Sequence, residues 1–284
     1  MAWLVVWLLC APGALASQSS PASDTVDLGD LSSVSLATFN YYPYQHHGEG
    51  MMIELYREAL AMQNIRLDVH IYPILRGVAE MLEHKVDAFS PGLFFIDDAL
   101  AQGQVTVVPT FRIQYGWFYK GDNDPRGRQD LTGTILVTPT PVKSVAPYDQ
   151  FFHERGAKIE TIESPDRLLR MVASERATFA SAPLLPGWLM LKKFRPQQLD
   201  QFGFAAYGPL MCTLAFSTSN PRTTYLKAQF EQGLQVIIAN GSYLQILERY
   251  WGKGNVPQEV LPESIRYQGS RHFDVRRLPQ HPEN

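Results

Sequence analysis

The feature that most constrains this chain is a regular alternation of strand-like and helix-like segments. Residues 34–39 are predicted to form a buried strand, residues 67–72 alternate like a strand, and residues 86–89 are predicted to form a third strand. Residues 52–63 and 74–84 lie between them and repeat apolar residues at helical spacing. This order predicts βαβ units, an α/β fold and a mainly parallel sheet. In such sheets, ligands gather at the carboxyl ends of the strands.

A second block of the same kind follows a long extended stretch. Residues 106–120 are rich in β-formers and aromatics, and their length suits a chain that leaves one sheet and enters another. In the second block, strands and helices are predicted to alternate over 134–138, 145–155, 158–162, 164–174 and 177–181. A return strand over 213–217 and two further helices are predicted to follow. Ser164 and Pro165 open one helix as a cap and a first-turn proline. We therefore expect two Rossmann-like lobes joined by a two-strand hinge near residues 114–117 and 214–217.

The chain ends are expected to lie outside the lobes. Residues 2–10 form an apolar run too short to span a bilayer, and Ala14 and Ala16 fit a signal-peptidase site. No Lys or Arg precedes that run. The predicted division is a signal peptide over 1–16, a flexible leader over 17–32, lobe 1 over 33–115 plus 216–256, lobe 2 over 116–215 and a loose tail over 257–284. The predicted signal peptide implies export.

Composition narrows the class of partner. A formal net charge of -3 without basic runs argues against nucleic acid. Of the two cysteines, Cys10 lies in the predicted signal and Cys212 is then left alone, which excludes a disulfide in the mature chain. Adjacent His46 and His47 lack a third ligand, so no metal is expected. No cofactor motif or enzyme signature was found.

Motifs along the chain resemble family 3 of the bacterial extracytoplasmic solute-binding proteins, which serve ABC transporters. The resemblance covers residues 33–254 and implies the type II periplasmic-binding fold. It rests on an aromatic-Pro-aromatic loop, a helix-strand junction, a crossover, a second-lobe opening and a C-terminal signature: Tyr42-Pro43-Tyr44, residues 84–88 (HKVDA), Pro109-Thr110-Phe111, Asp130-Leu131-Thr132-Gly133 and residues 240–252 (NGSYLQILERYWG).

The residues that bind an amino acid in this family are not matched here. Amino-acid binders of the family carry an Arg after the third strand to hold the ligand carboxylate, but residues 90–98 read SPGLFFIDD. Their Asp for the ligand ammonium corresponds to Ala182. The resemblance therefore does not imply a standard amino acid as ligand.

Other residues are candidates for the ligand site. Arg76 and Arg112 are candidates to hold an anion, with salt bridges as the alternative. Tyr41, Tyr42 and Tyr44 are candidates to stack on a ligand, with loop packing as the alternative. The predicted ligand-binding set comprises Tyr42, Tyr44, Arg76, Ser90, Gly92, Arg112, Thr138 and Thr140.

The resemblance, together with the absence of enzyme signatures, implies a monomeric, non-catalytic binding protein in the periplasm. It would capture a small polar or anionic organic solute between its lobes for an ABC permease. Two alternatives stay open, namely a binding module that docks on a membrane sensor and a dehydratase-like enzyme on the same fold.

Overall fold

The computed structural model describes residues 29–91, 95–139, 146–162, 164–265 and 273–279. The predicted signal peptide and most of the predicted leader lie outside these residues. Within them the chain forms one mixed sheet of eight strands in the order β2-β1-β3-β8-β4-β7-β5-β6. None of the described helices is long and apolar enough to cross a membrane.

Lobe 1 is built on three parallel strands, β1 (Ser33–Thr38), β2 (Arg66–Ile71) and β3 (Ala88–Phe89). Helices α1 (Met51–Ala61), α2 (Ile74–Leu82) and α3 (Asp97–Ala101) accompany them, and α7 (Pro221–Ala239) and α8 (Ser242–Trp251) complete the lobe. The apolar repeat predicted for α1 is confirmed, because these residues face the core: Met52, Leu55, Tyr56, Ala59 and Leu60.

Helices α1 and α7 approach each other closely. The rings of Tyr56 and Phe230 meet edge to face with centroids 5.5 Å apart. A Cβ at Gly233 would lie 2.7 Å from the carbonyl carbon of Ala59, so only glycine permits this approach. The pair fixes α1, whose N-terminal loop reaches toward the second lobe.

Lobe 2 repeats the pattern with β5 (Ile135–Thr138), β6 (Lys158–Thr161) and β7 (Phe179–Pro183), which pair in parallel. Its helices are α4 (Ala146–His153), α5 (Pro165–Ala173) and α6 (Leu184–Phe194). Pro165 occupies the first turn of α5 as predicted, but Ser164 makes no side-chain capping hydrogen bond. Helix α6 was not predicted, because Pro186 and Gly187 lie within it and both disfavour a helix interior.

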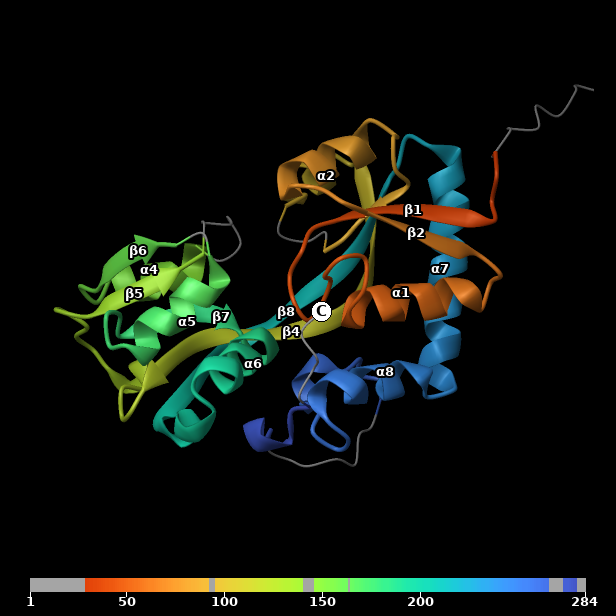
Figure 1. Cartoon of the computed structure of the whole chain (residues 1–284). Coiled ribbons are helices and arrows are strands. Elements are labelled where there is room, and N and C mark those ends of the chain that lie inside the picture. The colour runs from red at the N-terminus through yellow and green to blue at the C-terminus, as the bar shows by residue number, and fades with distance from the viewer. Residues whose placement is uncertain (1–28, 92–94, 140–145, 163, 266–272, 280–284) are drawn as a thin grey trace, which may run out of the picture.

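Two 16-residue strands, β4 (Val105–Lys120) and β8 (Phe202–Ser217), run through both lobes and pair antiparallel along their length. Figure 1 shows them as the connection between lobe 1 and lobe 2. Strand β4 was predicted almost residue for residue. The return strand is longer than the predicted 213–217, because glycines and Pro209 mask its first half in the sequence. The predicted lobe boundaries at 115/116 and 215/216 stay a prediction.

The expectation of a loose tail after residue 257 is wrong for the part that the structure describes. Val260, Leu261 and Leu278 are buried. Asn255 binds the main chain of Asp274 through both its side-chain oxygen and nitrogen, at 2.8 and 2.9 Å. Two short 3-10 turns, Gln258–Val260 and Val275–Arg277, lie in this segment. Its apolar residues are few and scattered, so they gave no periodic signal.

Candidate functional site

The candidate site is a small recess where residues of both lobes meet. Its volume is about 30 Å³, room for roughly one water molecule. Lobe 1 contributes Tyr41, from the loop after β1, and Tyr115 lies on the connecting strand β4. Lobe 2 contributes the end of β7 and the first turns of α5 and α6 through Leu168, Leu169, Ser181, Ala182, Pro186, Gly187 and Met190, together with Pro139 after β5.

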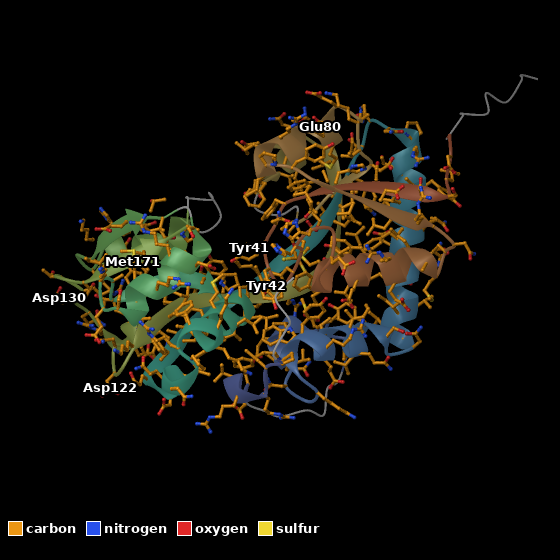
Figure 2. The ribbon with its side chains drawn as sticks, in the orientation of Figure 1. Tyr41, Tyr42, Glu80, Asp122, Asp130 and Met171 are labelled. Atoms are coloured by element: carbon orange, nitrogen blue, oxygen red, sulfur yellow. The ribbon has the colours of Figure 1, made fainter. Side chains whose placement is uncertain are left out.

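The loop that carries Tyr41 is held by hydrogen bonds between its own residues. The amide of Tyr44 donates to the carbonyl of Tyr41 at 2.9 Å, and Asn40 accepts from the amide of His47 at 2.9 Å. The rings of Tyr41 and Tyr44 stack with centroids 6.0 Å apart, and Tyr44 also packs 5.6 Å from Phe111. Tyr41 is thereby supported from lobe 1 and directed at lobe 2. Figure 2 shows it at the junction of the lobes.

Burial dominates the electrostatics of this loop. It raises the pKa of the Tyr41 hydroxyl well above its ordinary value, with nearby Tyr115 adding to the effect. It raises the pKa of Tyr44 in the same way. Both phenols are therefore neutral hydrogen-bonding groups at physiological pH. The Tyr44 hydroxyl is buried and has no hydrogen-bond partner among the described residues.

The two predicted stacking residues are placed differently. Tyr44 is 3% exposed and belongs to the lobe 1 core, so it supports Tyr41 rather than lining the recess. Tyr42 is 38% exposed and its ring meets His46 edge to face at 6.1 Å. Neither borders the recess, whereas their neighbour Tyr41 does. A role of Tyr42 or Tyr44 in ligand binding stays a prediction.

Ser90 is buried inside lobe 1. Its hydroxyl shares a 2.6 Å hydrogen bond with the Tyr56 hydroxyl, and its carbonyl accepts from Thr38 Oγ1 at 2.8 Å. Thr110 continues the network by donating to the carbonyl of Cys212 at 2.9 Å. These contacts use the Ser90 side chain within the lobe, so its predicted contact with a ligand has no support in this geometry.

The two candidate anion-binding arginines pair with carboxylates of the chain itself. Arg76 lies 3.3 Å from Glu80 on the exposed face of α2 and stacks over the Tyr72 ring at 5.6 Å. Glu80 lies at the outer edge of lobe 1 in Figure 2, away from the junction. Arg112 lies 3.1 Å from Glu263 of the C-terminal segment. Neither arginine borders the recess. Both form salt bridges, which was the stated alternative to holding an anion.

The remaining predicted residues divide between buried and undescribed positions. Thr138 is buried at the end of β5, where its carbonyl accepts from the amide of Ile162 at 2.9 Å. Gly92 and Thr140 lie outside the described residues, so their predicted roles stay predictions. The described residues hold no cluster of three or more His, Cys, Asp or Glu side chains placed to bind a metal ion.

Sequence reasoning did not place Tyr115, Ser181 or the apolar turns of α5 and α6 at the site. The position of Ala182 was identified only as the place of a missing Asp. One sequence signal could have identified Ser181. It is the last residue of the predicted strand over 177–181, and ligands of α/β folds bind at the carboxyl ends of strands. The helix after it was hidden by Pro186.

Comparison with known proteins shows the fold. A scan against protein-family models and a search of curated proteins both find no match. Solved structures do match. A histidine kinase sensor domain similar to periplasmic binding proteins shares 16% identity over 78% of this chain and 96% of its own, with a TM-score of 0.60. Substrate-binding domain 2 of GlnP from Lactococcus lactis, in its open conformation, shares 17% identity over 76% and 94%, with a TM-score of 0.56.

A third similar structure belongs to an ancestral amino-acid-binding protein described as a precursor of cyclohexadienyl dehydratase. It shares 15% identity over 77% of this chain and 94% of its own, with a TM-score of 0.59. These likenesses confirm the predicted fold class, two α/β lobes joined by two strands in the type II periplasmic-binding arrangement.

Proposed function

We propose that this chain, a protein with the type II periplasmic-binding fold, captures a small polar organic solute between its two lobes without transforming it. The observation that carries the proposal is the recess itself, which takes residues from both lobes and from connecting strand β4. A ligand held there contacts both lobes only when they are closed, so binding shifts the population toward the closed form.

The solute is proposed to be polar rather than anionic. Both arginines that would hold an anion are engaged by Glu80 and Glu263. An ionised solute in a buried recess needs a paired charge, and the recess residues named above include none. Of the two solute classes predicted from the sequence, polar and anionic, these contacts favour the polar one.

Catalysis is not part of the proposal, although the ancestral dehydratase precursor illustrates a link between this fold and an enzyme. The recess residues named above include two tyrosines and a serine but no carboxylate, histidine or lysine, and burial holds the pKa of Tyr41 high, away from that of a general base near neutral pH. A bound solute recovered chemically unchanged after incubation supports binding alone. A recovered product would contradict it.

For the partner, we propose an ABC permease that reads the closed lobes, with the protein exported as a monomer after cleavage behind Ala16. Likeness to a substrate-binding domain of GlnP supports this choice. Likeness to a histidine kinase sensor domain favours a second candidate, docking on a membrane sensor. A permease gene beside this one supports the first candidate, and a sensor-kinase gene without a permease supports the second.

The proposed function is tested by native mass spectrometry of the protein recovered from the periplasm. We expect a bound small molecule that is lost on mild unfolding and rebinds on refolding. Small-angle scattering should then show a smaller radius of gyration with the solute than without it. Identical scattering with and without a tightly bound solute would refute the closing motion.

A further inference from the structure

We infer that the C-terminal segment, residues 255–265 and 273–279, is a strap that limits how far the two lobes separate. The segment is fixed to lobe 1 and reaches α6 of lobe 2. In Figure 1 the end of this segment, in dark blue, lies between α8 and α6. The inference goes beyond the proposed function, because it concerns the motion of the lobes in the protein without a solute.

The last described part of the segment is anchored at the end of α8. Asn255 is 1% exposed, and its side chain accepts from the amide of Asp274 at 2.8 Å and donates to the carbonyl of Asp274 at 2.9 Å. The ring of Phe273 meets that of Trp251 edge to face, with centroids 5.6 Å apart. Because α8 belongs to lobe 1, this end of the segment moves with lobe 1.

A second anchor lies earlier in the segment, beside the connecting strand β4. Val260 and Leu261 are each 1% exposed, and the 3-10 turn Gln258–Val260 packs against β4. Glu263 accepts from the guanidinium of Arg112 on that strand at 3.1 Å. The segment is thus held at two places, on β4 and on α8, so it is not free to follow lobe 2 when the lobes move.

The contact with lobe 2 is made at Leu278. Lys192 Nζ on α6 donates to the main-chain carbonyl of Leu278, and Leu278 is 2% exposed. A hydrogen bond from an ammonium group is stronger than one between neutral groups, and it is stronger again where water is largely excluded. Separating Lys192 from Leu278 therefore carries a free-energy cost, which a surface contact would not impose to the same degree.

The position of Lys192 decides which motion this contact opposes. Met190, two residues earlier on α6, borders the recess together with Tyr41 of lobe 1. A hinge rotation about β4 and β8 that moves α6 away from Tyr41 also moves Lys192 away from Leu278, which stays with lobe 1. Opening of the lobes must therefore break the hydrogen bond. Without the bond, the more open forms become more populated.

The test measures the distance between the lobes in the full exported chain, after any bound solute has been removed by unfolding and refolding. Donor and acceptor fluorophores are attached through unnatural amino acids at Leu75 on α2 and Lys158 on β6, which are exposed and belong to different lobes. Single-molecule energy transfer reports the distance between them. Lys192→Met should shift the distribution toward longer distances. Lys192→Arg keeps a charged donor and should retain the wild-type distribution.

A strap is released by loosening either of its ends, whereas a local contact is lost only where it is made. Phe273→Ala loosens the segment from α8 and leaves Lys192 in place, so it should lengthen the distance as Lys192→Met does. Lys193→Met removes the same charge from the exposed neighbouring position and should leave the distance unchanged.

Lengthening in Lys192→Met without lengthening in Phe273→Ala would overturn the inference, because the hydrogen bond would then act locally. Unchanged or shorter distances in both variants would also overturn it, as would equal lengthening in Lys193→Met. If Lys192→Met does not fold, the distance in Phe273→Ala decides. No solute is added, so these outcomes are independent of solute capture, which is tested by mass spectrometry.

Discussion

Lys192 on α6 donates a hydrogen bond to the main-chain carbonyl of Leu278, and this contact joins lobe 2 to the C-terminal segment. That segment is anchored on lobe 1. Asn255 holds Asp274, Phe273 packs edge to face on Trp251 at 5.6 Å, and Arg277 donates to the carbonyl of Lys253 at 2.6 Å. A residue range expected to be loose therefore ties the two lobes together, in addition to β4 and β8.

The first prediction concerns this tie. Lys192→Met should lower the free energy of unfolding by about 1–2 kcal/mol, because it removes a charge-assisted hydrogen bond from a partly buried site. Amide exchange over residues 275–277 should accelerate at the same time. Lys193→Met removes the same charge from the exposed neighbouring position and is the control, which should leave exchange over residues 275–277 unchanged. Unchanged exchange in Lys192→Met would show that the bond does not hold the segment.

The second prediction concerns Leu278, which is 2% exposed. Leu278→Ala should destabilise the protein by about 2–3 kcal/mol, since it deletes buried methyl groups and leaves a cavity. Denaturant unfolding followed by tryptophan fluorescence measures the change. Val236→Ala serves as the control, because Val236 is 42% exposed and its truncation should cost much less. Equal effects of the two substitutions would contradict the packing of the C-terminal segment.

The third prediction separates structure from binding at Ser90. Because its hydroxyl bonds to Tyr56 within lobe 1, Ser90→Ala should cost about 1 kcal/mol of stability and leave solute affinity unchanged. Urea denaturation and titration with the recovered solute give the two quantities. If the loss of binding free energy exceeds the loss of folding free energy, Ser90 contacts the solute directly.

The fourth prediction concerns the pair Asp87–Arg222. Asp87 accepts from Arg222 Nε at 2.9 Å and from the amide and hydroxyl of Ser35 at 2.8 and 2.7 Å, and its side chain is only 10% exposed. Asp87→Ala should destabilise the protein by about 3 kcal/mol, because it leaves a guanidinium that is mostly buried without its partner. Asp68→Ala breaks an exposed pair with Arg66 and should cost less than about 1 kcal/mol. If the two substitutions lower the free energy of unfolding by similar amounts, the Asp87–Arg222 pair does not stabilise the fold more than an exposed pair does.

The fifth prediction is a pH dependence at His46. Partial burial, followed by repulsion from His47, lowers the pKa of His46 below its ordinary value. The folded protein therefore binds fewer protons than the unfolded chain just below pH 6.5, so this group's contribution to stability is present above pH 6.5 and declines as the pH falls. NMR titration should give a pKa below 6.5 that rises in His47→Ala. A pKa above 6.5 would reverse the sign.

Much of the scaffold was predictable because its signals are local. The repeat from Met52 to Leu60 buries one face of α1, and the segment from Ser242 to Trp251 forms helix α8. Strand β4 is dense in β-branched and aromatic residues, so its length was also visible. Helix α6 and the first half of β8 were missed, since prolines and glycines inside them carry the opposite local preference.

The amino-acid sequence by itself determined the fold class and most of the strands and helices, and it predicted that no amino-acid clamp is present at residues 90–98 and Ala182. Only the tertiary structure decided which candidates meet. It paired Arg112 with Glu263, 151 residues away, and turned Ser90 inward to Tyr56. It also brought Tyr41, Tyr115 and Ser181 around one recess. The reason is physical: periodicity reports which face of an element is buried, whereas a site depends on contacts between residues distant in the chain.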